Sequence, residues 1–342
     1  MASIVEMPEL VLEKVIGFSD FKAVLSLRQV CRDFRNFIDD LNDSKLPDSK
    51  FQEVKITSGD KRIEFELVDS DNFSNRILFS KAERSRRFYG NTEVFENSNI
   101  MDVAVRDLEM ILKFQKTILK QLRFEISSSC QHYNDSSVNA LPIKLSNMFK
   151  KLNRKIKTKV LIILADYPSE VMSIFDFVDP DTLKTLGFTL WGGYLETEID
   201  EFVKTEHWKK ADGMSSDFIV LNLNVEDICH FSSCSIRTNS ITAQELDFLR
   251  KTYTSSSNYK NSSIHLRSFN EIEELGNLWD PTDFFDSESS WLFRMKNSDE
   301  RILHIEIHED HSAHSTRKIV DFVEIPSSWV SPEAIIHDYN GN

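Results

Sequence analysis

Apolar residues recur at the spacing of α-helices near the start of the chain. Pro8 can begin a helix without losing a hydrogen bond, and Gly17 ends the first apolar stripe. Either Ser19 or Asp20 can cap the segment that follows. The pattern predicts three short helices, whose stripes are Leu10, Val11, Val15, Ile16, Phe21, Val24, Leu25, Leu27, Val30, Cys31, Phe34, Phe37, Ile38 and Leu41.

These helices carry more apolar side chains than they can bury among themselves. A bundle of about 40 residues rarely stands alone without a metal, disulfides or a partner. Two interpretations therefore remain open at this point. The helices pack on the following domain of the same chain, or they bind another protein.

Beyond Asp48 the pattern changes to the alternation typical of strands. It predicts antiparallel strands that are joined by turns at Ser58–Asp60 and at Asp71–Asn72. A long amphipathic helix is predicted from Asp102 to Leu119. The apolar positions of the three strands are Phe51, Val54 and Ile56, then Ile63, Phe65 and Leu67, then Ile77, Leu78 and Phe79.

Further along, short strands alternate with helical stretches at irregular intervals. The candidate strands are 121–127, 159–165, 185–191, 218–223, 231–237 and 261–267. This alternation is typical of βα units stacked like a degenerate leucine-rich repeat. The Ser- and Asn-rich segment 127–140 is predicted to be a long exposed loop.

The N-terminal stretch resembles an F-box. Met7 and Pro8 stand for the Leu-Pro of that family, and Leu10 and Ser19 depart from its pattern, since an acidic residue and a leucine are usual there. The matching apolar positions are Leu12, Val15 and Ile16 in the first helix and Leu25, Leu27, Val30, Cys31 and Phe34 in the leucine-rich centre and the Val-Cys-x-x-aromatic ending.

The resemblance implies binding to the Skp-type adaptor of a cullin–RING ubiquitin ligase. Burial of one such apolar side chain contributes roughly 1.5–3 kcal/mol before the costs of association. Ser19 removes one contribution and leaves a hydroxyl to be satisfied, so we expect weaker adaptor binding than is usual. The residues that the resemblance implies for adaptor binding are Pro8, Leu12, Val15, Ile16, Leu25, Leu27, Val30, Cys31 and Phe34.

A second stretch is similar to the FTH domain of nematode F-box A proteins. The similarity rests on His207–Ala211 and on the segment 231–260, and it extends over about residues 100 to 290. Within it, Ile241–Tyr253 reads as a helix with Thr242 as N-cap and Glu245 three residues later. The resemblance implies a domain that recognises a target or partner, with no catalytic residues.

The predicted fold class is α+β or α/β, with a small three-helix F-box before an irregular leucine-rich-repeat-like stack of strands and helices. We expect an F-box at 1–48, a β-rich connecting segment at 49–100, an FTH-like α/β repeat domain at 101–290, and a C-terminal β-hairpin and tail at 291–342.

Charge and composition limit the classes of partner and the cellular locations that we expect for the chain. The 342 residues carry a formal net charge of −14, whose field repels phosphate, so neither direct nucleic-acid binding nor binding to an anionic membrane is expected. No apolar run approaches the roughly 20 residues that span a bilayer, and the start of the chain does not resemble a signal peptide. We therefore expect the cytoplasm or the nucleus, with the 4 cysteines reduced.

The sequence lacks the common signatures of phosphate-binding loops, nucleophile elbows and zinc hydrolases. The segment 304–314 is rich in histidine, and His304, Glu306 and His308 would share one face of a strand near His311 and His314. The simpler interpretation is the exposed face of a hairpin with 290–295, so no metal and no cofactor is predicted.

Two other features allow a binding role. The basic stretch 149–159 either contacts an acidic partner or forms the solvated end of a helix whose apolar side is Ile143, Leu145, Met148, Phe149 and Leu152, and the second interpretation is favoured. The WGGY turn at 191–194 and the corner at Trp279–Pro281 are candidate exposed recognition loops.

The preferred hypothesis is a non-enzymatic substrate receptor that binds the adaptor, and through it a cullin, with its F-box and an unknown protein target with its α/β domain. The first alternative is an F-box scaffold that acts outside a ligase, joined to a regulatory or RNA-binding protein. The second is an enzyme that uses the cluster from His304 to His314.

Overall fold

The computed structural model describes residues 7–88, 90–126, 140–165, 168–190, 196–279, 283–285, 288–296, 298–310 and 317–339. These residues fall into two compact units. The N-terminal unit is Met1–Leu161 with Ser169–Thr182, and the C-terminal unit is Ile162–Pro168 with Leu183–Asn342. The predicted loop at 127–140, apart from Ala140, and the WGGY turn at 191–194 lie outside the described residues.

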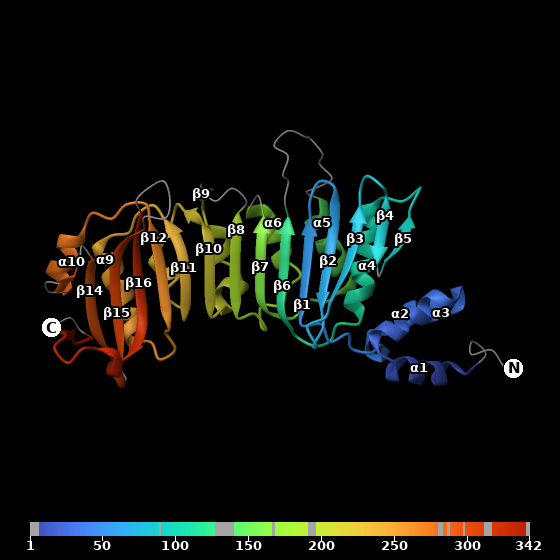
Figure 1. Ribbon diagram of the computed structural model, residues 1–342, viewed down its shortest axis with the longest axis horizontal. Coiled ribbons are helices and arrows are strands. Elements are labelled where there is room, and N and C mark those ends of the chain that lie inside the picture. Colours follow the sequence, from blue (N-terminus) through green and yellow to red (C-terminus); the bar gives the residue numbers. More distant parts are fainter. Residues whose placement is uncertain are drawn as a thin grey trace. The chain divides into compact units, whose positions relative to one another are not determined.

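The chain begins with the three predicted helices, α1, α2 and α3 (Figure 1). Of the two candidate caps, Asp20 caps the second helix, because its carboxylate accepts a hydrogen bond from the amide of Ala23 at 2.7 Å. The bounds are α1 Glu9–Phe18, α2 Phe21–Val30 and α3 Arg32–Asp40, followed by a 3₁₀ turn at Asp43–Lys45.

The sheet of the N-terminal unit combines an antiparallel meander with one parallel strand. Strands β1 to β5 pair in chain order, each antiparallel to the next, and β6 pairs with β1 in parallel. The first three strands were predicted, whereas the short, polar β4 and β5 were not. The bounds are β1 Glu53–Ser58, β2 Arg62–Val68, β3 Ser74–Ser80, β4 Ser85–Phe88, β5 Asn91–Val94 and β6 Leu119–Ile126.

Helices α4 (Ile100–Lys113) and α5 (Ala140–Leu152) lie against one face of this sheet (Figure 1). The helix predicted to reach Leu119 ends six residues earlier, at Lys113, so its predicted end was wrong. The reason is Gln115, whose side chain donates to the carbonyls of Phe51 and Thr117 and accepts from the amide of Phe51. These bonds to non-helical backbone replace another helical turn and let β6 begin at Leu119.

The remaining elements of the N-terminal unit follow α5. Strand β7 (Thr158–Ala165) begins in this unit, and α6 (Pro168–Phe175) contributes nearly all of its residues to it.

The apolar side predicted for α5 is confirmed at Leu145, Met148 and Phe149, which are buried, but Ile143 is 59% exposed. The assignment of Ile143 to the buried side was therefore wrong.

The C-terminal unit begins with parallel strands. β10 pairs in parallel with β8, β9 and β11, and β11 with β12. The predicted strand at 218–223 ends earlier, at Val220, and begins earlier, at Gly213. The bounds are β8 Thr185–Leu190, β9 Glu196–Thr197, β10 Gly213–Val220, β11 Ser233–Thr238 and β12 Asn261–Leu266, with helices α7 Asp200–Val203 and α8 Glu206–Lys210 and a 3₁₀ turn Val225–Asp227 between them.

Antiparallel strands complete this unit. β12 pairs with β16, β16 with β15, β15 with β14 and β14 with β13, and β17 joins β14 in parallel. The hairpin of β14 and β15 was predicted from the sequence. The bounds are α9 Ala243–Ser255, α10 Ile272–Trp279, β13 Asp283–Phe285, β14 Glu288–Met295, β15 Ser298–Asp310, β16 Arg317–Pro326, a 3₁₀ turn Ser327–Trp329 and β17 Ile336–His337.

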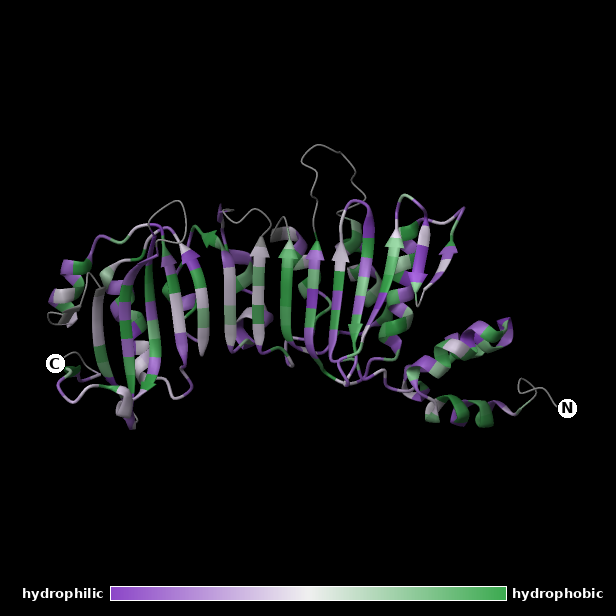
Figure 2. Ribbon diagram, in the orientation of Figure 1, coloured by the Kyte–Doolittle hydropathy of each residue, from purple (hydrophilic) through white to green (hydrophobic). Residues whose placement is uncertain are grey.

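The core of each unit lies between the strands and the helices on one face. Alternate residues of the strands are buried, which gives the banded colouring of the strands in Figure 2. In the N-terminal unit Phe65 and Phe124 are fully buried, and in the C-terminal unit Leu249 and Phe322 are. Three N-terminal helices followed by mixed sheet and helices make an α+β fold, as predicted.

Candidate functional site

The three N-terminal helices enclose a small core of their own. Leu12 and Ile16 point inward from α1, Val24 from α2, and Phe34 and Ile38 from α3, each at most 5% exposed. The spacing of four residues between Leu12 and Ile16 places both on one side of α1. The stripe of Leu12 and Ile16 thus packs α1 into the core of the bundle.

A second apolar stripe of α1 faces away from this core. Residues four apart on a helix lie on one face, so Met7, Val11 and Val15 form a line that continues to Phe18. Figure 2 shows α1 as largely hydrophobic and α3 as largely hydrophilic. The exposed side chains, here called the α1 surface, are Met7 (42%), Leu10 (67%), Val11 (43%), Val15 (39%) and Phe18 (88%).

Val30, at the end of α2, is also exposed, at 68%. Cys31 follows it between two helices, and its sulfur accepts a hydrogen bond from the amide of Phe34 at 3.5 Å. Cys31 is thus the N-cap of α3, while Phe34 fills the bundle core. The Val-Cys-x-x-aromatic ending therefore combines an exposed side chain, a cap and a core residue.

Ser19 does not leave an unsatisfied hydroxyl. Its side chain donates to the carbonyl of Val15 at 2.7 Å, and its amide donates to the carbonyls of Val15 and Ile16, where α1 ends. The hydroxyl is therefore satisfied at the helix end, where the carbonyl of Val15 accepts from both the side chain and the amide of Ser19. The expected polar penalty at Ser19 is absent, although the apolar contribution of a leucine is still missing.

The bundle is attached to the rest of the N-terminal unit through α2 and the turn after α3. The ring of Phe21 packs edge-on against Phe51 at 5.3 Å and against Phe114 at 5.0 Å. Arg154 reaches Asp43 at 3.4 Å. The helices therefore do pack on their own chain, as one interpretation expected, and the α1 surface remains exposed.

The structure places the nine predicted adaptor-binding residues in three groups. Pro8, Val15 and Val30 are exposed, Leu25, Leu27 and Cys31 are half-buried, and Leu12, Ile16 and Phe34 are buried. Sequence reasoning missed Met7, Leu10, Val11 and Phe18 as members of an exposed surface. The signal that could have found them is a second apolar repeat, one position out of step with Leu12 and Ile16.

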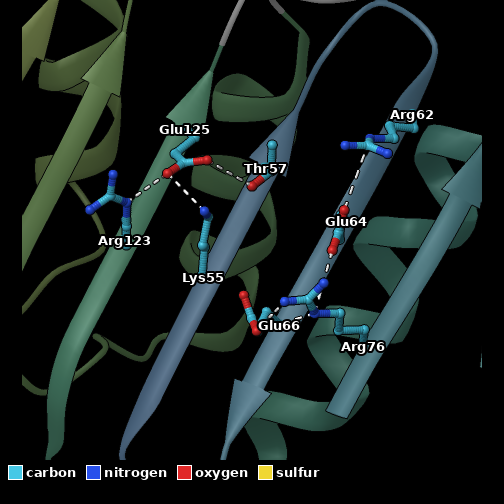
Figure 3. A network of polar contacts seen from close by, with 8 residues as sticks. All are labelled: Lys55, Thr57, Arg62, Glu64, Glu66, Arg76, Arg123 and Glu125. Carbon is cyan, nitrogen blue, oxygen red and sulfur yellow. Dashed lines mark hydrogen bonds and ion pairs between the residues drawn. The ribbon is translucent and has the colours of Figure 1, made fainter. Parts of the chain in front are cut away.

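The sheet face away from α4 and α5 is polar in the N-terminal unit (Figure 3). Glu125 accepts hydrogen bonds from Lys55, Arg123 and Thr57 at 2.9, 2.7 and 3.2 Å. Burial alone would raise the pKa of Glu125, but the bonds from Lys55 and Arg123 outweigh it and the pKa is lowered. The carboxylate is thus ionised and paired, which does not suit a general acid.

A second group of charges on the same face is paired in the same way. Arg76 lies 3.0 Å from Glu66 and 3.9 Å from Glu64, which Arg62 also approaches to 3.9 Å (Figure 3). The hydrogen bond from Ser74 and the charge of Arg76 lower the pKa of Glu66. This face is a network of mutually compensated charges.

The histidine-rich strand does not gather a metal site among the residues that the structure describes. His304 shares a hydrogen bond of 2.8 Å with Ser290 on the neighbouring strand, and His308 lies 3.8 Å from Asp321. Ile305 and Ile307 point inward, as the hairpin interpretation expected. His311 and His314 lie outside the described residues.

Two other candidate binding features have structural roles. Trp279 is 1% exposed and donates to Asp247 at 2.9 Å, so its assignment to an exposed corner was wrong, while positions 280–281 lie outside the described residues. In the basic stretch, Lys150 pairs with Asp176 at 3.1 Å, and Lys151 is exposed at the end of α5. This agrees with the solvated helix end that the sequence favoured.

Comparison with known proteins gives the class of the chain. The F-box domain family matches residues 4–46, and the FTH domain family matches residues 141–281. Within the second match, Trp208 is buried and donates to the carbonyl of Asp227 at 2.8 Å, so it belongs to the core, whereas Lys209 and Lys210 of the same motif are exposed. The chain thus contains an F-box domain and an FTH domain.

Among curated proteins the chain is similar to F-box A protein 224 of Caenorhabditis elegans. The two are 20% identical over 298 residues, which is 86% of this chain and 74% of that protein. No solved structure matches the chain. F-box domains generally bind Skp1 and through it a cullin, and F-box proteins are generally non-catalytic subunits. The domain therefore implies a role in substrate recognition of the SCF type.

Among the described residues no helix has the length and apolar character to cross a membrane.

Proposed function

We propose that this chain is a substrate-recognition subunit of an SCF-type ubiquitin ligase. Its N-terminal helices bind a Skp-type adaptor and thereby a cullin, and the rest of the chain binds a protein target in the cytoplasm or nucleus. The chain then supplies no chemical group. It raises the effective concentration of target lysines near a ubiquitin-charged enzyme that other subunits hold.

The observation that supports this proposal best is the α1 surface. Its five apolar side chains are exposed although the bundle has already closed its own core. A contiguous apolar patch of this kind on a helix marks a surface for protein contact. Val15 and Val30, with Pro8, contact the adaptor directly in this proposal.

The other predicted residues have different parts in the proposed contact. Leu25, Leu27 and Cys31 are half-buried, and in this proposal they contribute only the atoms that remain accessible. Leu12, Ile16 and Phe34 act through the bundle, because they fix the positions of α1 and α3 from within. The proposal adds Met7, Leu10, Val11 and Phe18 to the direct contacts.

The test is adaptor binding by the double variant Val15→Asp, Phe18→Asp. Burial of each native side chain contributes roughly 1.5–3 kcal/mol, and a buried unpaired carboxylate adds a further cost, so the Kd should rise at least about 100-fold. Titration calorimetry with purified adaptor measures the change. Phe73→Asp is the matched control, since Phe73 is a 67% exposed phenylalanine of the N-terminal unit outside the helices.

Unchanged affinity in the double variant would refute the α1 surface as the docking site. Purification from cells then decides between the two roles of an F-box protein. Recovery of adaptor and cullin together supports the ligase subunit, and recovery of the adaptor with a stable partner but no cullin favours the scaffold.

A further inference from the structure

A cavity of about 620 Å³ opens in the N-terminal unit, and no residue of the α1 surface lines it. It is lined by residues of α2, α3 and α4 and by strands β2 to β5. Its volume falls within the range of about 300–1,000 Å³ that is usual for small-molecule sites. The apolar part of its wall includes Phe21, Leu25, Phe51, Phe88, Phe95 and Met110.

Guanidinium groups also line this cavity. Arg28 is paired with Asp39 by two hydrogen bonds of 2.7 and 2.9 Å. Arg86 is paired with Asp107 at 2.6 Å and also with Glu93. All three carboxylates of the wall are therefore already engaged.

Two further arginines of the wall, Arg35 and Arg106, have no carboxylate partner among the described residues. Four guanidiniums against three carboxylates leave a net positive charge in the cavity, within a chain whose formal net charge is −14. A local excess of positive charge on an acidic protein selects for anions. Guanidinium groups bind carboxylates and phosphates through paired, charge-assisted hydrogen bonds.

We propose that this cavity binds a small amphipathic organic anion, with an aromatic or aliphatic body and one carboxylate, sulfonate or phosphate group. The body lies on the aromatic and aliphatic wall, and the anionic group meets Arg35 and Arg106. A volume of about 620 Å³ suits a small molecule better than a long peptide.

The position of the cavity lets one ligand connect two parts of the N-terminal unit. Its wall is shared by Phe21 and Leu25 of α2 and by Met110 of α4, so one ligand contacts the N-terminal helices and a helix of the sheet domain at once. A ligand that binds only the folded arrangement stabilises it. Occupation should therefore raise the melting temperature of the full chain. This proposal does not depend on the proposed ligase function, since it concerns the chain without an adaptor.

The test uses the full chain and the fluorescent probe anilinonaphthalene sulfonate. Phenylnaphthylamine, which has the same rings without the sulfonate, is the neutral control probe. We expect saturable one-to-one binding of the sulfonate with a Kd at least about tenfold lower than that of the neutral probe, as one charge-assisted hydrogen bond provides. Equal affinity for both probes, or no saturable binding, would overturn the proposal.

Variants locate the probe. Arg35→Gln with Arg106→Gln should weaken sulfonate binding at least about tenfold and leave the neutral probe unchanged. Arg87→Gln is the matched control, because Arg87 is an exposed arginine next to Arg86 on β4 but is not part of the wall. If the double variant binds the sulfonate as tightly as the native chain, the probe lies elsewhere and the proposal fails.

Displacement of the sulfonate probe distinguishes the possible anionic groups. Octanoate and octyl phosphate test a carboxylate and a phosphate, and octanol tests the apolar body alone. Displacement by either anion at concentrations where octanol has no effect supports the proposal. Failure of both anions, or equal displacement by octanol, contradicts it.

Discussion

At the scale of single residues, Arg250 shows how the C-terminal unit tolerates a buried charge. Its side chain is 2% exposed, yet its donors reach Asp247 at 2.8 Å and the carbonyl of Tyr339 at 2.9 Å. The guanidinium also lies over the ring of Phe293, 4.6 Å from its centre. Trp279 donates to the same carboxylate of Asp247. One buried cation thus joins α9, α10, β14 and the C-terminal segment.

Arg250→Met should destabilise the chain by about 1.5–3 kcal/mol, because the carbonyl of Tyr339 loses its donor and Asp247 keeps only Lys251 and Trp279 as partners. Urea unfolding followed by tryptophan fluorescence measures the loss, since Trp279 and Trp291 pack edge-on at 5.1 Å near this cation. Lys251→Met is the control. Lys251 pairs with the same Asp247, but its side chain is 59% exposed, so its loss should cost less than about 1 kcal/mol.

Sequence reasoning identified residue types well and exposure less well. The helix that contains Arg250 was predicted, but the sequence does not indicate that this arginine is buried. Trp279 looked like an exposed corner because a proline follows two residues later, but its indole finds a partner in Asp247. Phe18 drew no attention, since a single phenylalanine at a helix end does not reveal which side is covered. Exposure depends on what packs against a residue, which spacing alone does not encode.

At the scale of elements, α9 is the helix whose start the sequence specifies most fully. Thr242 accepts a hydrogen bond from the amide of Glu245 at 3.2 Å, and the Glu245 carboxylate accepts from the amide of Thr242 at 2.8 Å. These two bonds form the predicted capping box. The adjacent amide of Ala243 donates to Glu271 at 2.6 Å, so a third terminal donor is satisfied from outside the helix.

Thr242→Ala should lower the free energy of unfolding of this region by about 1 kcal/mol, because one amide at the helix start loses its partner. Hydrogen exchange of the amides of Ala243 to Leu246, measured by mass spectrometry, should become faster. Thr252→Ala in the same helix is the control. The hydroxyl of Thr252 donates only to the carbonyl of Phe248 within the helix, and alanine has the higher helix propensity. An equal effect of both substitutions would contradict the role of the capping box.

Strands and helices were predicted where local pattern decides them. Alternation of Ile63, Phe65 and Leu67 is enough to mark β2, because every second residue faces the core. The end of α4 was missed because it depends on Gln115 bonding to Phe51, 64 residues away. The parallel pairing of β1 with β6 is likewise a contact between distant segments. Local sequence does not contain such information.

At the scale of the whole molecule, several carboxylates are held ionised by their partners. Burial opposes ionisation of Asp48, Glu125 and Asp247, but hydrogen bonds from neighbouring groups outweigh it and lower each pKa. The pKa of His265 is also lowered, first because burial disfavours its charged form and then because Arg237 repels it. Both kinds of shift act against protonation of the folded chain.

Stability should therefore be greatest above the ordinary histidine pKa of 6.5 and should fall in two stages on acidification. Since the unfolded chain binds a proton at His265 more readily than the folded chain, the first loss occurs as the pH falls from 6.5 through the lowered pKa. The carboxylates contribute fully above their ordinary values, 3.8 for Asp and 4.5 for Glu, and that contribution is lost as the pH falls through their lowered values. Melting temperatures measured between neutral and acidic pH test this order.

The variant His265→Gln should remove the first stage and keep the second, because glutamine does not titrate. If the native chain becomes more stable as the pH falls below 6.5, the assignment to His265 is wrong.

The α1 surface also favours self-association of the free chain. Phe18 is 88% exposed beside four other exposed apolar side chains. The helix therefore presents the same apolar surface to every other copy of the chain. Copies in excess of the protein that covers this surface would contact one another, and aggregation would compete with assembly. The supply of the covering protein would then set how much of this chain a cell can hold in usable form.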